Sequence, residues 1–295
     1  MVSVYISVIL LFRVVQALFN KRSSLEIKNL TMLVGYNAFK NAISAVLGLV
    51  LILAAGKGFH FSPMTVLIAS FSGLALFFSG FFSIYSMKSG TVSLNSMFGT
   101  AGMLIPIIAG AVFFSQPIAP MQLVGLALFF LSAYLLIGAS RQVYANFSGK
   151  TLLLLIGTMI ANGCTMLAQQ MFTRCVPEGD VSVFSFLSFG IIALLSSVLY
   201  KTLPGSRDKT VDTRLNRPLI ICGVALAVSV FFINQLATLS TALLSPVILF
   251  AFINGGGTII STLVAALVYR ERITAKTGLG IVIGIASLLI IKAFE

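Results

Sequence analysis

The sequence is poor in charge. Only 9% of its 295 residues are charged, against about a quarter in typical soluble domains, while 58% are hydrophobic. A soluble domain of this length has no way to hide so much apolar surface from water, so the composition excludes a soluble protein. It favours a chain whose side chains mostly face lipid.

Carboxylates, histidine and cysteine are scarce as well. The chain has 7 Asp and Glu, 1 His (His60, in a predicted loop) and 3 Cys, which are Cys164, Cys175 and Cys222. The cysteines lack the spacing of a metal motif or a disulfide framework, so we expect no metal and no cofactor. The apolar runs contain no acid or histidine, which disfavours a membrane-embedded lipid enzyme and proton antiport through a buried Glu. The chain also has no GxxxxGK[ST] loop for ATP-driven transport.

Long apolar runs dominate what is present. We predict ten transmembrane helices, because about 20 apolar residues span a bilayer as a helix. Strands of a membrane barrel would alternate apolar and polar residues, so the predicted fold class is an all-α, multi-pass protein of the cell membrane. The first run lacks a basic segment before it and is predicted to be a span, not a cleaved signal. The predicted spans cover residues 2–19, 31–55, 63–87, 91–114, 118–139, 151–173, 181–201, 218–239, 243–268 and 275–293.

Basic residues outnumber acidic ones, 19 to 7, which gives a net charge of +12. Almost all of them fall in short loops, where Lys and Arg set topology and contact anionic lipid, so membrane lipid and not nucleic acid is the expected partner. The loops after the odd-numbered spans hold 14 of these residues and the other side holds 3. The positive-inside rule then predicts that both termini lie outside.

The two halves of the chain resemble each other. A shift of 150 residues brings eight identities into 22 positions, between residues 73–94 and 223–244. We therefore predict two five-helix repeats, 1–140 and 150–295, in one integrated membrane domain. Five spans per repeat force opposite orientations, and such inverted repeats are typical of transporters with a site near the midplane. A shift of 155 residues matches the further pairs Gly102/Gly257, Ala111/Ala266, Ile118/Ile273, Gly125/Gly280 and Ser132/Ser287.

The end of the second half carries the most specific pattern. Residues 266–274, ALVYRERIT, place Glu271 just before the last span, and the apolar run GLGIVIGIASLLII begins at Gly278. With the five-span halves, this pattern resembles the ten-span EamA-like members of the drug/metabolite transporter superfamily over nearly the whole chain. The resemblance implies a secondary carrier or exporter with both termini cytoplasmic, opposite to the charge count. Gln116 stands at the first-half position that matches Glu271, so a role that needs both acids is not expected.

Polar side chains recur at helical spacing in eight predicted spans, whereas the spans at 118–139 and 275–293 are nearly bare. Polar groups in lipid are costly, so a shared cavity would explain the eight faces and would leave the two bare spans at the periphery. The alternative is that the polar residues serve only for interhelical hydrogen bonding and packing. The candidate solute ligands are Asn41, Asn95, Asn162, Gln169, Asn234, Gln235 and Asn254.

Two cations interrupt the predicted spans. Arg13 and Lys40 would lie at similar depth, where an uncompensated charge costs at least ~2.5–3.5 kcal/mol. No acid lies inside a predicted span to pair with them. The functional hypothesis is that both bind an anionic group of the substrate at one mouth of the cavity, so that replacing Lys40 cuts transport. The alternative is that both snorkel to the interface and only set topology.

Glycines mark two further places. The run 255–257 directly follows Asn254 and weakens the helix there, which favours either unwound backbone beside a cavity or close packing. Gly280 and Gly284 form a GxxxG pattern, which is typical of helix packing or of a homodimer contact.

These features together predict a secondary transporter, with export the expected direction, that carries a small polar metabolite or drug by alternating access. A channel or lipid scramblase is the alternative, and a lipid enzyme is a weaker one. Saturable flux with counterflow would separate a carrier from a channel.

Overall fold

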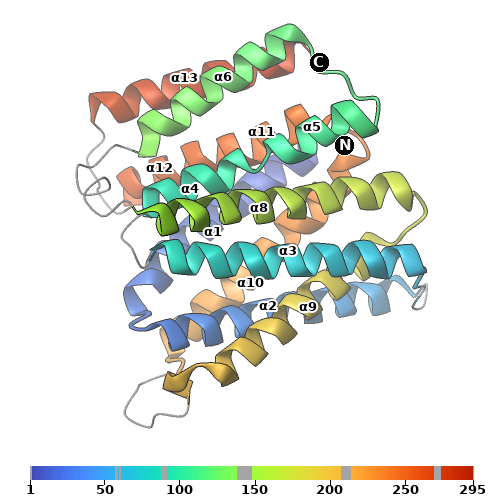
Figure 1. Cartoon of the computed structure of the whole chain (residues 1–295), viewed down its shortest axis with the longest axis vertical. Helices are drawn as coiled ribbons and strands as arrows, with labels where there is room; N and C mark the ends of the chain where they lie inside the picture. Colours follow the sequence, from blue (N-terminus) through green and yellow to red (C-terminus); the bar gives the residue numbers. More distant parts are fainter. Residues whose placement is uncertain are drawn as a thin grey trace.

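The structure is a computed structural model that describes residues 2–56, 59, 61–87, 92–137, 148–206, 214–268 and 274–294. Every secondary-structure element in these ranges is a helix (Figure 1). The first half holds α1 (Val2–Glu26), α2 (Leu30–Ala55), α3 (Pro63–Met87), α4 (Val92–Ala101), α5 (Leu104–Phe113) and α6 (Pro120–Ile137). The second half holds α8 (Gly149–Cys175), α9 (Val181–Thr202), η1 (Pro204–Ser206), α10 (Arg217–Thr241), α11 (Pro246–Ala251), η2 (Phe252–Gly256), α12 (Gly257–Val268) and α13 (Ala275–Ala293).

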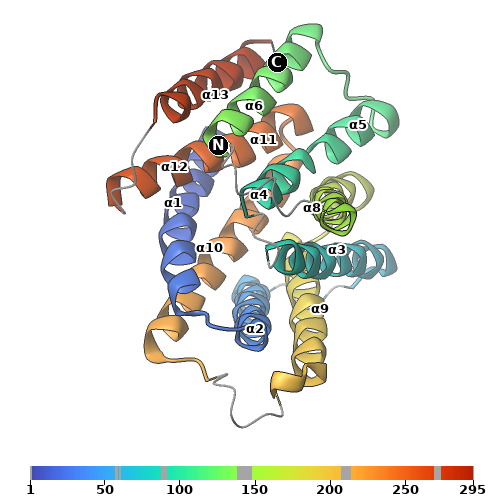
Figure 2. The ribbon, with the colours of Figure 1, turned by 60° about the vertical axis from the view of Figure 1, so that its left-hand side comes forward.

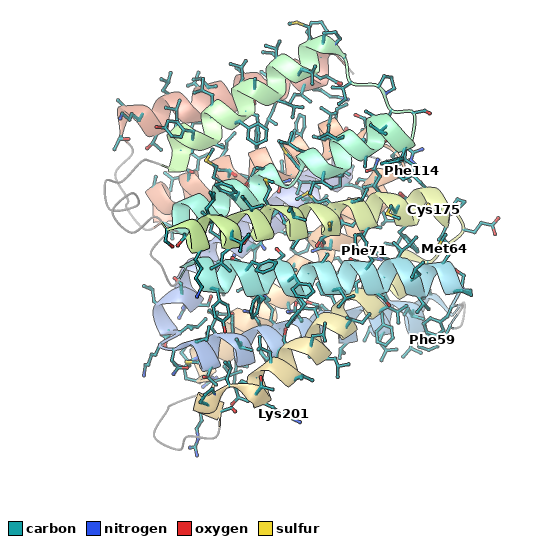
Figure 3. The ribbon with its side chains drawn as sticks, viewed as in Figure 1. Phe59, Met64, Phe71, Phe114, Cys175 and Lys201 are labelled. Atoms are coloured by element: carbon teal, nitrogen blue, oxygen red, sulfur yellow. The ribbon has the colours of Figure 1, made fainter. Side chains whose placement is uncertain are left out.

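The outer surface of the bundle is apolar. Among the described residues, eight helical stretches are long and apolar enough to cross a membrane, so the chain is a multi-pass helical membrane protein. Side chains such as Met64 and Phe71 project from the outer surface, 46% and 38% exposed (Figure 3). In water such a surface would be unfavourable, whereas in a bilayer it contacts hydrocarbon.

Polar residues begin several helices at the predicted breaks. Asn29 and Asn216 accept hydrogen bonds from backbone N–H groups three residues later, at 2.7 and 3.0 Å. Such caps satisfy donors that the start of a helix leaves open. The predicted end of the first span at residue 19 is wrong for the helix, because residues 21–24 are helical and α1 continues to Glu26. Polar residues end an apolar run, but a helix can leave the membrane and continue in water.

The predicted spans at 91–114 and 243–268 are not single continuous helices. In the first, α4 ends before Gly102 because Pro106 has no N–H for the Gly102 carbonyl, and its ring crowds that carbonyl. Gly102 also lies against α8, where an added Cβ would be 2.6 Å from the Met159 carbonyl oxygen. In the second, the π-helical segment η2 separates α11 from α12. Segments of this kind are frequent at functional sites.

Helices of one half pack against helices of the other. The most extensive contacts join α2 with α9, α6 with α13, α3 with α8 and α1 with α10. Figures 1 and 2 show α6 and α13 side by side at one edge of the bundle, with α2 and α9 toward the opposite edge. The peripheral position expected for the two bare spans agrees with this arrangement. Gly280 and Gly284 face α6 of the same chain, where Ser132 Oγ donates to the Gly280 carbonyl oxygen at 2.7 Å.

Candidate functional site

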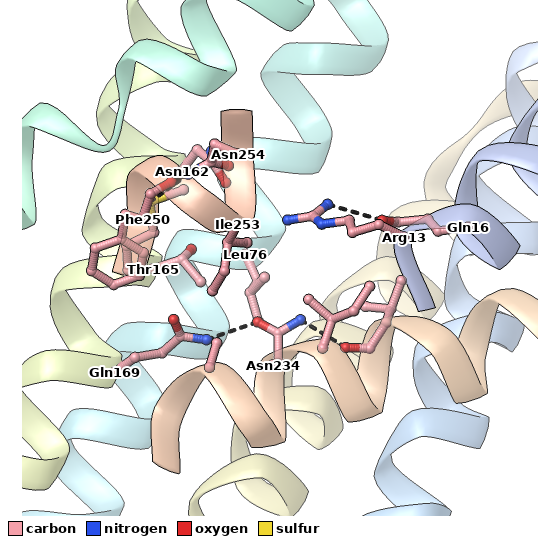
Figure 4. A pocket seen from close by; sticks show the side chains of 14 residues that line it. Arg13, Gln16, Leu76, Asn162, Thr165, Gln169, Asn234, Phe250, Ile253 and Asn254 are labelled. Atoms are coloured by element: carbon pink, nitrogen blue, oxygen red, sulfur yellow. Dashed lines mark hydrogen bonds between the residues drawn. The ribbon is translucent and has the colours of Figure 1, made fainter. Parts of the chain in front are cut away.

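A cavity of about 190 Å³ lies between the two halves of the bundle. Its walls come from α1 and α3 of the first half and from α8, α10, α11 and η2 of the second (Figure 4). Five of the nine predicted site residues line it. Polar solutes are excluded from lipid, so a cavity with polar walls gives such a solute a place to bind inside the membrane. The polar and charged lining residues are Arg13, Gln16, Asn162, Thr165, Gln169, Asn234 and Asn254.

Arg13 brings a positive charge to the cavity. It lies near the middle of α1, about 16 Å from the first residue of that helix at 1.5 Å per residue. Its Nη1 donates to Gln16 Oε1 at 2.9 Å, and its Nε is buried without a hydrogen-bond partner. Figure 4 shows the guanidinium extending from α1 toward the segment that carries Ile253 and Asn254. The side chain therefore turns into the cavity instead of snorkelling to the interface.

The glycine run 255–257 lets neighbouring side chains approach the helix at η2. The sequence left unwound backbone and close packing open as explanations, and the structure favours close packing, because the segment remains helical. The backbone is π-helical from Phe252 to Gly256, and each glycine faces a side chain that a Cβ would crowd. An added Cβ would lie 2.6 Å from Phe129 at Gly255, 2.7 Å from Leu10 at Gly256 and 3.3 Å from Arg13 at Gly257.

Amide side chains form the rest of the polar lining. Gln169 Nε2 donates to Asn234 Oδ1 at 2.9 Å and joins α8 to α10. Asn162 Nδ2 donates to the Gly99 carbonyl at 2.6 Å and ties α8 to the end of α4. Asn254 Nδ2 donates to the carbonyl one turn earlier in its own helix, at 2.9 Å. Because a neutral amide both donates and accepts, this lining suits hydroxyl, carbonyl or amide groups of a solute.

Four predicted site residues do not line this cavity. Lys40 is half-buried on α2, and Asn41 donates to the backbone carbonyl four residues earlier at 2.8 Å. Asn95 donates to Ser83 Oγ at 2.6 Å. Gln235 accepts from one α9 serine at 2.6 Å and donates to another at 3.1 Å. For the three amides, interhelical or local hydrogen bonding fits better than solute contact in this conformation.

Two lining residues, Gln16 and Thr165, were not among the predicted solute ligands. They lie three positions after Arg13 and Asn162, and helical spacing places them on the same polar faces. His60 and Glu271 lie outside the described residues. Within the described ranges, no group of three or more His, Cys, Asp or Glu side chains could hold a metal ion.

Four side chains beside the cavity join the end of α8 to the end of α10 and to the turn after α5. We call Gln116, Gln170, Thr173 and Thr241 the amide–threonine cluster. Gln170 Nε2 donates to Gln116 Oε1 at 2.9 Å, and the hydroxyl oxygens of Thr173 and Thr241 lie 2.9 Å apart. Thr173 and Thr241 each lie one helical turn beyond a cavity-lining residue, so the cluster borders the cavity toward one end of the bundle. The Oε1 atom of Gln170 is buried without a hydrogen-bond partner, which makes this network less stable than one in which every buried polar atom is paired.

Comparison with known proteins places the fold and nothing finer. Neither a protein-family model nor the sequence of a curated protein matches this chain. Among solved structures, 29 chains match. One of them, a crystal structure of a protein with 14% sequence identity, superposes with a TM-score of 0.80 over 99% of this chain and 98% of its own. At that identity the likeness establishes a shared overall fold across nearly the full length of both chains.

Proposed function

We propose that this chain is a secondary transporter that carries a small polar solute across the cell membrane by alternating access. The observation that carries the proposal is the polar cavity, which lies between the two halves of an apolar helical bundle and is lined by both. Arg13 lines this cavity and lies at the middle of a membrane-spanning helix, so the cavity would lie near the centre of the membrane. Secondary transporters bind their solutes at this kind of position, near the midplane and between repeats.

The proposed topology has ten spans. Two shorter apolar stretches, Met97–Phe113 and Pro120–Leu136, add to the eight long ones. The 18 residues of α6 extend about 27 Å at 1.5 Å per residue, close to the roughly 30 Å of a hydrocarbon core. The interrupted pair α4–α5 counts as one span because its break is packed against α8 and so is not exposed to lipid.

The packing pattern supports two inverted repeats. Exchanging the halves turns α1 into α8, α2 into α9, α3 into α10 and α6 into α13. Under this exchange the α1–α10 pair becomes the α3–α8 pair, and the α2–α9 and α6–α13 pairs each map onto themselves. This is the pattern expected from a two-fold axis that relates the halves.

Glycines that match in the two halves add to this support. An added Cβ on Gly125 of α6 would lie 2.6 Å from Ile291 of α13, and one on Gly280 of α13 would lie 3.0 Å from Leu135 of α6. The two helices thus pack on each other in the same way from both sides. Gly102 and Gly257 match as well, and each stands at the interruption of its helix.

The proposed family is the EamA-like branch of the drug/metabolite transporter superfamily, on the sequence pattern around Glu271. Export as the direction rests on that resemblance. The cavity limits the size of the solute, because its volume of about 190 Å³ is less than the roughly 300–1,000 Å³ of pockets that bind drug-sized ligands. A small metabolite therefore fits this conformation better than a drug.

The amide–threonine cluster favours a carrier over a channel. It bonds the end of α8 to the end of α10 and to the turn after α5, beside the cavity. A contact that closes one end of the site while the solute is bound is a requirement of alternating access, whereas a channel opens to both sides at once. In this proposal the cluster is the closed gate on that side.

Counterflow in proteoliposomes tests the proposal. Vesicles loaded with a mixture of unlabelled organic acids, amino acids and sugars would be assayed for uptake of each labelled member. A carrier gives saturable uptake that a matching internal solute accelerates. Uptake that rises linearly with concentration and shows no counterflow would instead identify a channel, and the absence of any flux would reject transport.

A further inference from the structure

Among the described residues, no acid lies at the cavity to act as a counter-ion for Arg13. The acidic residues in the described ranges are Glu26, Glu178 and Asp180, at the end of α1 and in the turn between α8 and α9. Glu26 lies about 20 Å along α1 from Arg13 at 1.5 Å per residue, and it accepts a hydrogen bond from Asn216 at 2.8 Å. A guanidinium held inside a membrane protein without an anion is unfavourable, so the site is electrostatically incomplete.

Arg13 retains an unpaired hydrogen-bond donor beside the cavity. Gln16 occupies Nη1 and holds the group in place, whereas Nε is buried and has no partner. An arginine presents parallel N–H bonds along its edge, which match the two oxygens of a carboxylate or phosphate. Gly257 leaves room for this orientation, since its missing side chain is replaced by the Cδ and Nε region of Arg13.

We propose that Arg13 binds the anionic oxygen group of the solute, so that the solute is a small net anion with a neutral, polar remainder. This inference rests on the proposed transport function and assigns its solute to a class. One anion on one arginine makes a neutral complex, which is the least costly one to hold at the centre of a membrane. Gln16 acts as a positioning residue, and the lining amides on α8, α10 and η2 bind the remainder. An ammonium group would find no carboxylate among the lining residues.

Pairs of acids and amides test this charge preference at constant size. The full-length protein in nanodiscs of zwitterionic lipid would be unfolded thermally with lactate or lactamide, succinate or succinamide, and benzoate or benzamide. At least one acid is expected to raise the unfolding temperature in a dose-dependent way, and its amide is not. Equal shifts from acid and amide, or no shift from any acid, would overturn the proposal.

Substitutions then assign the preference to Arg13. R13Q is expected to weaken binding of the stabilising acid by at least about tenfold, because a charge-assisted pair is lost. R13K keeps the charge but not the fork and should fall between wild type and R13Q. R174Q, which removes an exposed arginine from the last turn of α8, is the matched control and should bind as wild type does. If R13Q binds the acid with unchanged affinity, the proposal is overturned. If R13Q does not fold, unchanged affinity in R13K overturns it instead.

The oxyanion could belong to a soluble acid or to a lipid headgroup, and a second nanodisc separates the two. In discs that contain phosphatidylglycerol, a lipid ligand would raise the unfolding temperature of the wild type but not of R13Q, and would abolish the effect of the soluble acid. A soluble ligand would retain its effect in both discs. Counterflow distinguishes the transport proposal from the anion-site proposal. Flux that R13Q does not affect would support transport and reject the anion site. Acid binding that depends on Arg13, without any flux, would support the anion site and reject transport.

Discussion

The Cβ that Gly257 lacks would lie 3.3 Å from Cδ of Arg13. These two residues are 244 positions apart and belong to opposite halves of the chain. Their contact brings the first residue after the π-helical segment to the centre of α1, beside the cavity. The shape of one half thereby sets where the charge of the other half points.

Gly257→Ala is expected to weaken anion binding about two- to tenfold. An added methyl group at this distance moves the Arg13 stem by a few tenths of an ångström, and an off-rotamer arginine costs about 0.5–1.5 kcal/mol. Titration of the unfolding temperature with the stabilising acid measures the change. Gly190→Ala on α9 is the control, since nothing lies within 4 Å of its added Cβ. Equal affinities in the two variants would show that Gly257 does not position Arg13.

Cysteines at the amide–threonine cluster should lock the proposed gate in its closed state. The hydroxyl oxygens of Thr173 and Thr241 lie 2.9 Å apart, so cysteines at these positions would place two sulfur atoms in contact, from which a small shift allows a disulfide. In a background where Cys164, Cys175 and Cys222 are serine, Thr173→Cys with Thr241→Cys is expected to cross-link on mild oxidation and to lose counterflow. Reduction should restore it. Each single variant controls for the substitutions themselves, and full activity of the cross-linked protein would mean that this contact does not open.

The hydrogen bond between Gln169 and Asn234 should contribute a small coupling energy. Buried hydrogen bonds between membrane helices average about 0.6 kcal/mol in double-mutant cycles, with a maximum near 1.7 kcal/mol. Gln169→Leu, Asn234→Leu and the double variant, compared by their free energies of unfolding in mixed micelles, measure it. A coupling energy of zero would indicate that other contacts hold each amide in place and that the hydrogen bond between them does not stabilise the fold.

Gly102→Ala is expected to destabilise the fold by about 1–3 kcal/mol. The added Cβ would lie 2.6 Å from a backbone carbonyl oxygen of α8, which moves only with the whole helix, so the change overpacks the helix crossing. The free energy of unfolding in detergent checks this against Gly190→Ala, which should be neutral or slightly stabilising. Similar stabilities for both would indicate that α4 and α5 can separate from α8 at low cost.

The spacing of polar residues predicted which helix faces are polar, but not which other helices or cavities those faces contact. Helical spacing along α8 led to Asn162 and Gln169, and both line the cavity. Helical spacing also led to Asn41, which bonds within α2, and the adjacent polar pair at 234–235 led to Gln235, which bonds to α9. A helical period states which residues share a face, whereas the crossing of helices decides what that face meets.

Arg13 and Lys40 show the same limit for charge. Sequence reasoning placed them at similar depth and favoured Lys40 as the anion ligand. In the structure Arg13 turns into the cavity, and Lys40 is not among its lining residues. Depth follows from counting residues along a helix, but rotation about the helix axis depends on packing with the neighbouring helices.

Long apolar runs without charge were enough to predict a helical membrane protein, because such runs are stable in lipid and only a few backbone structures satisfy their hydrogen bonds there. The runs did not predict where α4 and α5 separate, where η2 forms, or that Gln116 contacts Gln170, 54 positions away. These features depend on which backbones approach closely enough to exclude a side chain. That information belongs to pairs of helices and is not contained in the composition of either one.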